Sequence, residues 1–191
     1  MTEPLRPVEL TGPGLLLRPW TALPNQRDAA DLRVGLSDPE QARWNPNAPL
    51  TDPGEQAVHD WVGRLLARTA EGTGASWAVR DPDSGRLLGH LGLREVEFTT
   101  GSARIGYWIM PGARGRGLAR AATELASRWA FGELGLHRIE LAHAVGHEAS
   151  CAIARRAGYR LEGVLREALP DSYGTRHDLH LHARLATDPV G

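Results

Sequence analysis

The apolar positions change their period within residues 105–135. Residues 105–110 are almost continuously apolar or aromatic, which predicts a buried strand. Pro111 and Gly112 end that strand. Farther on, the apolar positions recur at helical spacing as one stripe: Leu118, Ala122, Leu125 and Trp129. The pattern therefore predicts a strand, a tight turn and a long helix.

A glycine-rich turn with basic residues joins this strand to this helix. Gly115 and Gly117 bracket the turn, and Arg114, Arg116 and Arg120 add positive charge. Backbone N–H groups at a helix N-terminus favour phosphate, and glycine lets an anion approach the backbone closely. The turn is thus a candidate phosphate or pyrophosphate site. The alternative interpretation is a tight connection with surface arginines.

Two other phosphate-binding motifs do not fit this turn. A Walker loop ends in Gly-Lys followed by Ser or Thr, whereas Gly117 is followed by Leu118 and Ala119. A dinucleotide fingerprint needs glycine or alanine at the position of Arg120, and too little chain follows for a second half-sheet. A nucleotide-binding protein of either kind is therefore disfavoured.

The remaining pattern predicts one α+β domain. Helical spacing predicts helices at 25–36 and 148–156. A further helix is predicted to begin at Asp52, which can cap it, with Pro53 in its first turn. Strands are predicted at 15–18, 76–80, 87–96, 103–110, 138–144, 159–166 and 177–185. Because a helix joins 103–110 to 138–144, these two strands are expected to be parallel. The prediction is a mixed, mostly antiparallel sheet of about seven strands with about four helices. Residues 13–186 form the domain, between a flexible arm at 1–12 and a tail at 187–191.

The composition of the chain argues against several classes of partner and location. The 191 residues carry a net charge of −1, which gives no general reason to bind nucleic acid or an anionic membrane. The first residues do not resemble a signal peptide, and no apolar run is long enough to span a bilayer. One cysteine, Cys151, excludes an internal disulfide and fits a reducing compartment. A cytoplasmic protein is expected.

The run Arg114-Gly115-Arg116-Gly117-Leu118-Ala119 matches the [RQ]-x-x-G-x-[GA] signature, and here the chain resembles the GNAT superfamily of acyl-CoA-dependent N-acetyltransferases. The strand at 106–109, the segment 134–141 and the run from Ala149 to Gly163 resemble its RimJ/RimL-type branch. The likeness covers about residues 13–186. It implies acetyl-CoA as co-substrate, no metal, and a primary amine acceptor that is either a protein N-terminus or a small molecule. A homodimer is plausible in this branch.

The resemblance also implies where the cofactor lies. In this fold the fourth and fifth strands, here 103–110 and 138–144, are parallel and splay apart, and pantetheine pairs with the first of them. The pyrophosphate would lie on the turn at 114–119, and a backbone N–H at Ile109 or Met110 would polarise the thioester carbonyl. The amine would attack directly in a ternary complex.

A hydroxyl group is the candidate partner of the leaving thiolate. The family helix opens with Asn-x-x-Ser, and this chain has His147-Glu148-Ala149-Ser150. The resemblance assigns Ser150 a hydrogen bond to the coenzyme A sulfur. His147 stands where relatives have asparagine and either caps the helix or shuttles a proton. The alternative is that Ser150 only starts the helix and His147 is an exposed cap.

The sequence leaves several candidates for the general base. Relatives often have Ala-Glu-Ile-Gly-Tyr, but here Arg104 replaces that glutamate. Glu95 and Glu97 lie two residues apart, which predicts that they share one face of a strand and leaves either as a base acting through water. The alternative is that both pair with arginines on a solvated face, and Glu167 is a third candidate base.

Other residues have substrate-binding or structural interpretations. Trp44 is a candidate substrate wall, and one of Tyr107 and Trp108 should face the cleft while the other is core. His177, His180 and His182 with Asp178 suggest a metal site, but the family implies none, and Cys151 is interpreted as a small core thiol. A competing function is an acyl-CoA-binding module that has lost catalysis.

Overall fold

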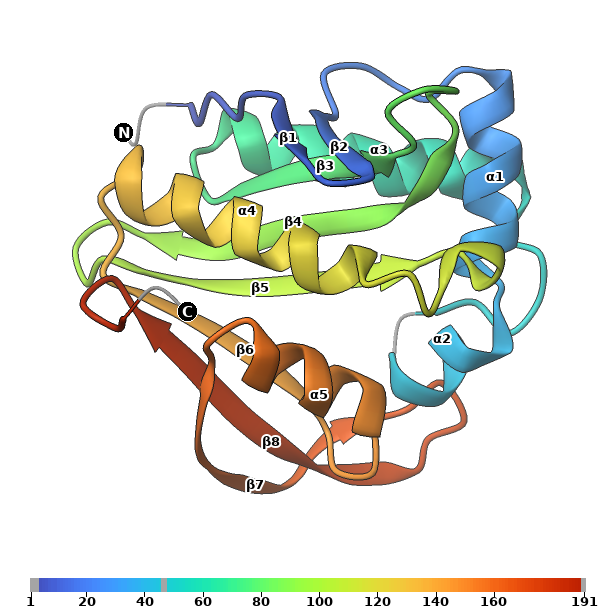
Figure 1. The fold of residues 1–191 in the computed structure, drawn as a ribbon. Coiled ribbons are helices and arrows are strands. Elements are labelled where there is room, and N and C mark those ends of the chain that lie inside the picture. Colours follow the sequence, from blue (N-terminus) through green and yellow to red (C-terminus); the bar gives the residue numbers. More distant parts are fainter. Residues whose placement is uncertain (1–3, 46–47, 190–191) are drawn as a thin grey trace.

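A mixed sheet of eight strands forms the centre of the protein (Figure 1). The computed structural model describes residues 4–45 and 48–189. The strands run in the spatial order β1-β2-β3-β4-β5-β6-β8-β7, and among the described strands only β5 and β6 are parallel. Their bounds are β1 Leu10–Gly12, β2 Leu15–Pro19, β3 Gly74–Arg80, β4 Leu87–Glu97, β5 Ser102–Ile109, β6 Arg138–Ala144, β7 Arg160–Pro170 and β8 Arg176–Leu185.

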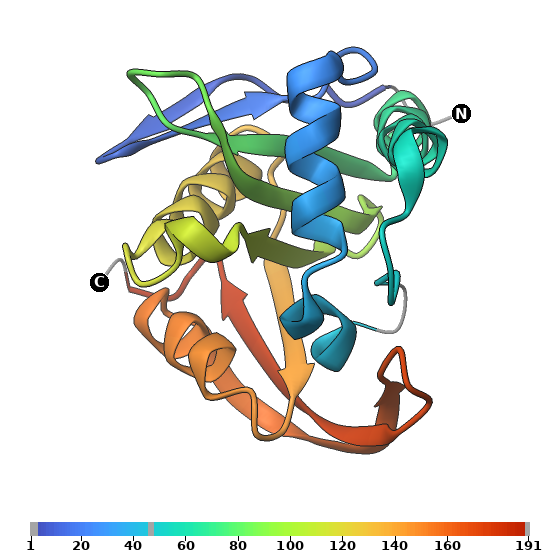
Figure 2. The same ribbon diagram turned by 90° about the vertical axis from the view of Figure 1, so that its right-hand side faces the viewer.

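Helices cover both faces of this sheet. They are α1 Gln26–Leu36, α2 Pro39–Trp44, α3 Gly54–Ala70, α4 Leu118–Gly132 and α5 Glu148–Arg156, with a 3-10 turn at Pro111–Ala113. Helices α1 and α3 pack on β4 and β3, whereas α4 packs on the other face against β1, β2 and β5 (Figure 2). Helix α5 lies over β6 and β7 and contacts α4. No helix in the described ranges is long and apolar enough to cross a membrane.

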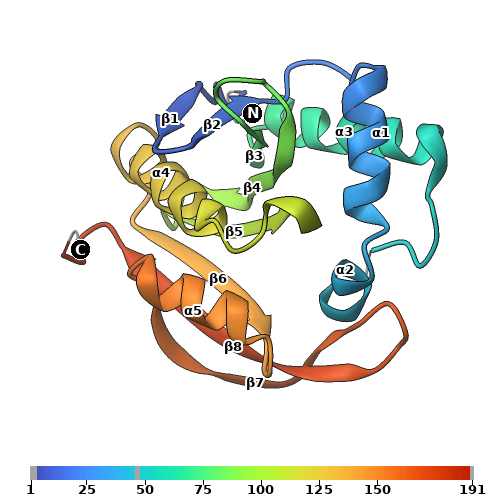
Figure 3. The same ribbon diagram turned by 45° about the vertical axis from the view of Figure 1, so that its right-hand side comes forward.

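The parallel strands β5 and β6 pair over a short length and then separate. Their register joins Ser102 to Arg138, Ala103 to Ile139 and Arg104 to Glu140, and it ends there. Beyond this point β6 runs away from β5 toward α5 (Figure 3). The prediction of a splayed parallel pair is confirmed, and the separation leaves one edge of β5 without a neighbouring strand.

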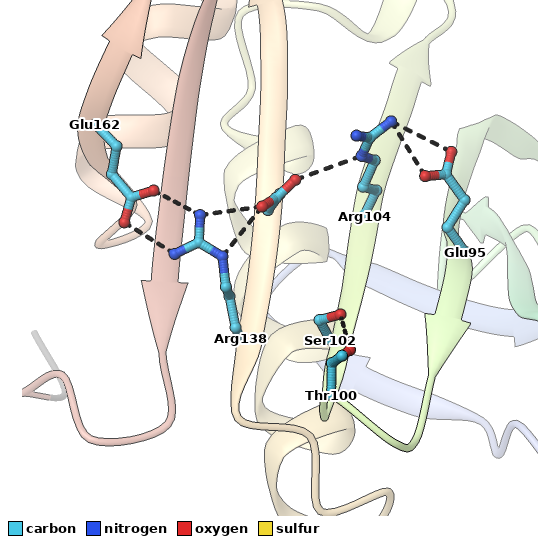
Figure 4. A network of polar contacts seen from close by, with 7 residues as sticks. Glu95, Thr100, Ser102, Arg104, Arg138 and Glu162 are labelled. Carbon is cyan, nitrogen blue, oxygen red and sulfur yellow. Dashed lines mark hydrogen bonds and ion pairs between the residues drawn. The ribbon is translucent and has the colours of Figure 1, made fainter.

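A chain of ion pairs crosses the sheet at the base of this separation (Figure 4). Arg104 contacts Glu95 at 3.1 Å and Glu140 at 3.4 Å, and Arg138 contacts Glu140 at 3.0 Å and Glu162 at 2.5 Å. Because Arg104 and Glu140 are the last paired residues of β5 and β6, the chain of charges joins the strands where they diverge. Arg104, at the position of the family's glutamate, therefore links strands here.

The sequence missed two short elements. Residues 4–12 are not a loose arm: Leu5 is buried, and Leu10–Gly12 pairs with β2. Helix α2 lies in a stretch that the prolines had suggested was irregular. Helix α3 begins at Gly54 rather than at Pro53, and the Asp52 carboxylate accepts the Gly54 N–H at 3.0 Å. Elements of three to six residues carry too little periodicity to be recognised.

A buried histidine lies in the core between the sheet and α3. Trp20 Nε1 donates to His90 Nδ1 at 3.3 Å, and the ring packs against the rings of Trp61 and Trp108. Burial among these aromatic groups lowers the pKa of His90 to about 3. The folded protein therefore holds this imidazole neutral.

Acidification is expected to destabilise the protein through His90. Below pH 6.5 this histidine binds a proton in the unfolded chain but not in the folded protein. The free energy of unfolding therefore falls by about 1.4 kcal/mol per pH unit, down to the folded pKa of about 3. Between pH 7 and pH 5.5, the free energy of unfolding measured in urea should fall by about 1 kcal/mol less for His90→Gln than for the native chain. Equal losses in the two proteins would mean that His90 takes up a proton while folded.

Candidate active site

The turn between β5 and α4 presents a helix N-terminus that no described side chain caps. Gly115 and Gly117 have φ of 76° and 75°, in the left-handed region that glycine adopts without strain. Gly117 is the N-cap of α4, and no side chain of the described residues caps it. The first N–H groups of a helix have no intrahelical partner. A Cβ added at either glycine would meet no described atom within 4 Å, so their backbone faces open space.

The arginines beside this turn have different roles. Arg114 Nε donates to the Ile109 carbonyl at 3.2 Å, and its guanidinium pairs with Asp38, so this side chain ties the end of β5 to the start of α2. Arg116 lies 3.9 Å from Asp81, a weak contact, and its side chain is half exposed. Arg120 pairs with Glu124 one turn along α4. Positive charge therefore remains beside the turn, although Arg114 is held elsewhere.

Of the two backbone N–H groups predicted to polarise the thioester carbonyl, one already has a partner in the sheet. Met110 N–H donates to the Leu88 carbonyl at 2.8 Å, so the prediction that Met110 offers a free amide is wrong. Successive amides of a strand point to opposite sides. Since the Met110 amide points toward β4, the Ile109 amide points toward the separation between β5 and β6. Ile109 alone of the predicted pair suits a thioester carbonyl.

Four predicted site residues come together beside this separation. His147, the N-cap of α5, accepts the Ser150 N–H through Nδ1 at 3.4 Å. Trp44 of α2 stacks on the His147 ring with centroids 4.8 Å apart. Ser150 is only 8% exposed and acts electrostatically on the Tyr107 hydroxyl of β5. Residues far apart in the sequence thus line one site between α2, β5 and α5.

The two hydroxyl groups sit in a poorly hydrated environment. Burial raises the pKa of Tyr107 to about 12, and the Ser150 side chain opposes this shift. Within the described chain, the buried Tyr107 oxygen has no hydrogen bond of normal geometry, so Ser150 is near it without a formed bond. Burial also lowers the pKa of His147. A neutral ring and two hydroxyl groups therefore lie close together at the start of α5.

The predicted carboxylate bases lie elsewhere. The register shifts between Arg94 and Glu97, and Glu95 has a φ of 51°, so a bulge interrupts the strand; Glu95 and Glu97 are nevertheless both exposed on either side of buried Val96, as their spacing predicts. Glu97 is opposite Ser102, which lies about 23 Å along β5 from Ile109 at ~3.3 Å per residue. Both carboxylates are exposed, with Glu95 paired to Arg104 and Glu97 accepting the Thr99 N–H. A β-bulge cannot be recognised from spacing alone.

The sequence missed a histidine–carboxylate pair near the site. His177 Nε2 lies 3.0 Å from Asp171 Oδ2, and this contact lowers the pKa of Asp171. The His177 ring lies 5.9 Å from the Trp44 ring. A histidine oriented by a carboxylate is a common arrangement for proton transfer. His177 had suggested only a metal ligand, because its carboxylate partner lies across the β7–β8 turn.

Comparison with known sequences places the chain in a family. The sequence profile of the "Acetyltransferase (GNAT) domain" family matches residues 14–160. The chain belongs to this family. In Bacillus subtilis, the "Putative ribosomal N-acetyltransferase YdaF" is 37% identical over 107 residues, which cover 56% of this chain and 58% of that protein. The match thus spans under two thirds of that relative's length.

Solved structures extend the likeness over almost the whole chain. A probable GNAT-family acetyltransferase from Chromobacterium violaceum is 28% identical with a TM-score of 0.79, covering 97% of this chain and 90% of that one. RimL, a ribosomal L7/L12 alpha-N-protein acetyltransferase solved with coenzyme A, is 19% identical with a TM-score of 0.81, covering 93% and 97%. At that identity RimL shows only a shared fold, and the GNAT family assignment rests on the sequence profile.

Proposed function

We propose that this GNAT protein is an acetyl-CoA-dependent N-acetyltransferase that acts on a primary amine. The observation that carries the proposal is the uncapped N-terminus of α4, with its left-handed glycines, beside the unpaired edge of β5. Similar folds have been solved with this class of ligand: RimL with coenzyme A, and the microcin C7 immunity acetyltransferase MccE with acetyl-CoA and AMP.

Each part of the cofactor has a matching group. The pyrophosphate accepts hydrogen bonds from the amides at 115–119, with Arg116 and Arg120 adding charge. Pantetheine extends along the free edge of β5, as an added strand would. The acetyl carbonyl then lies at the Ile109 amide, and the sulfur lies toward Ser150.

The reaction follows from these positions. The amine nitrogen attacks the thioester carbonyl carbon, and the Ile109 N–H stabilises the oxyanion that forms. The C–S bond then breaks, and Ser150 donates its hydrogen bond to the departing thiolate. The nitrogen loses its proton through water to His177, which Asp171 orients. The thiolate takes a proton from solvent and His177 releases the one it gained, so the products are an amide and coenzyme A.

The acceptor enters past an aromatic and acidic wall. Trp44 stacks on His147 and carries the Arg43 guanidinium over its ring at 4.7 Å, so it forms a rigid aromatic wall. Glu40 accepts a hydrogen bond from Trp44 Nε1 at 2.7 Å. Together with Asp171, Glu40 supplies negative charge to the side from which the acceptor arrives. This environment suits an amine that is protonated before it binds, either a protein N-terminus or a small molecule.

A thiol-release assay with acetyl-CoA and a panel of amines tests the proposal. Peptides with free and blocked N-termini and small primary amines cover both acceptor classes. Coenzyme A release that depends on one class of amine supports the proposal. Tight coenzyme A binding with no release against any amine would instead favour a binding module without catalysis, because Arg104 and His147 stand where relatives have other residues.

Trp44→Ala is expected to affect only the acceptor. Loss of the wall should raise the KM for the amine about fivefold, consistent with an aromatic contact worth about 1 kcal/mol, and leave the KM for acetyl-CoA unchanged. Steady-state kinetics with each substrate varied in turn measures both constants. Phe98→Ala, at an exposed site in the β4–β5 turn, is the matched control. A higher KM for acetyl-CoA alone would place Trp44 on the cofactor side.

A further inference from the structure

A second cluster of chemically active side chains lies beside the site. His143, His180, His182 and Cys151 each offer one ligand atom, and these atoms all lie within 4.8 Å of one another. The β6–β8 register places His143 opposite His180, and His182 lies two residues farther along the same face of β8. Helix α5 adds Cys151 over that face. The mechanism proposed above uses none of these four residues.

Two of the histidines turn lone pairs toward each other. His143 Nδ1 lies 2.9 Å from the Ala144 carbonyl, and His182 Nδ1 lies 3.2 Å from the Tyr159 carbonyl. A carbonyl oxygen only accepts, so each Nδ1 carries the hydrogen and each neutral Nε2 is left with a lone pair. Yet the two Nε2 atoms are only 3.2 Å apart. Two lone pairs at this distance repel unless a positive species lies beside both.

A metal ion satisfies this geometry. Two nitrogens bound tetrahedrally to zinc at ~2.0–2.1 Å lie roughly 3.3 Å apart, close to the 3.2 Å between the Nε2 atoms. Metal-bound histidines commonly donate their other ring N–H to a backbone carbonyl, as His143 and His182 do. The backbone contacts thus present both rings as metal ligands do.

The other two residues complete the set of ligands. His180 has a buried Nδ1 without a hydrogen-bond partner in the described chain, so this nitrogen is open to a ligand. Cys151 is the only cysteine of the sequence and is partly buried beside the three rings. Of the histidines first considered for metal binding, His177 contacts Asp171 instead.

We propose that His143, His180, His182 and Cys151 bind one divalent ion of the zinc class. Three imidazoles and a thiolate suit zinc and exclude calcium and magnesium, which prefer oxygen ligands. On binding, the Cys151 thiol loses its proton to solvent and its sulfur bonds to the metal, while the three imidazoles bind neutral. Four protein ligands leave no open position, so the ion ties α5 to β6 and β8.

Cobalt binding tests the proposal independently of acetyltransferase activity. The full chain, freed of metal with a chelator, is titrated with Co²⁺ and followed by absorption spectroscopy. We expect one ion per chain, with a thiolate-to-cobalt charge-transfer band and the visible bands of a tetrahedral site. Zinc should then displace cobalt, and bound zinc should protect Cys151 from alkylation.

Two variants make the test specific. Cys151→Ser should abolish the charge-transfer band, and His180→Asn should weaken cobalt binding at least about 100-fold. His59→Asn, on α3 and outside the cluster, should bind as the native chain does. Circular dichroism checks that each variant is folded. Absence of cobalt binding by the folded native chain, or unchanged affinity in both folded cluster variants, would overturn the proposal.

Discussion

Replacing Gly117 by valine is expected to weaken acetyl-CoA binding about 100-fold or more. With its φ of 75°, Gly117 holds a conformation that β-branched residues strongly disfavour, so valine must turn the backbone and redirect the amides at the start of α4. Two hydrogen bonds to a charged group, at about 1.5–3 kcal/mol each, exceed the ~2.7 kcal/mol that corresponds to 100-fold. Titration calorimetry with acetyl-CoA measures the loss.

The matched control is Gly14→Val in the turn between β1 and β2. Gly14 has a φ of 70°, and a Cβ there would also meet no described atom within 4 Å, so the substitution adds comparable strain away from the site. Both variants should lower the free energy of unfolding, but only Gly117→Val should lose acetyl-CoA affinity. If the two variants bound acetyl-CoA with equal affinity, the turn before α4 would not be the cofactor site.

Ser150→Ala is expected to lower kcat about 100-fold with little change in the Kd of acetyl-CoA. The hydroxyl is proposed to donate to the thiolate only as the C–S bond breaks, so its loss affects the transition state more than the bound cofactor. The contact that orders the start of α5 survives, because it is the Ser150 backbone N–H that His147 accepts. Kinetics and calorimetry on the same preparation separate the two effects.

Ser84→Ala, an exposed serine in the β3–β4 turn, is the control for Ser150. It should retain native kcat and Kd. If Ser150→Ala kept native turnover, Ser150 would have only a structural role at the helix start. If it lost binding and turnover together, Ser150 would hold the cofactor in the ground state.

The parts of the fold recognised from sequence depend on local signals. The stripe on α4 and the glycines at 115 and 117 lie within one short stretch, so periodicity and turn chemistry suffice to predict them. The parallel pairing of β5 and β6 follows from the helix that joins them. The candidate phosphate-binding turn can therefore be recognised from the sequence.

The parts that were missed depend on partners distant in the sequence. The Met110 amide has an acceptor only because β4 lies beside β5, and the bulge at Glu95 depends on the same strand pairing. His143 joins His180 and Cys151 only through the register of β6 against β8 and the placement of α5. Neither register nor bulge leaves a spacing signature that one sequence reveals.

A crystal structure with coenzyme A tests the central claim most directly. The account predicts that diphosphate oxygens lie within about 2.7–3.2 Å of backbone nitrogens at 115–119, with the sulfur directed toward Ser150. A diphosphate bound elsewhere, with the N-terminus of α4 facing only solvent, would contradict the account.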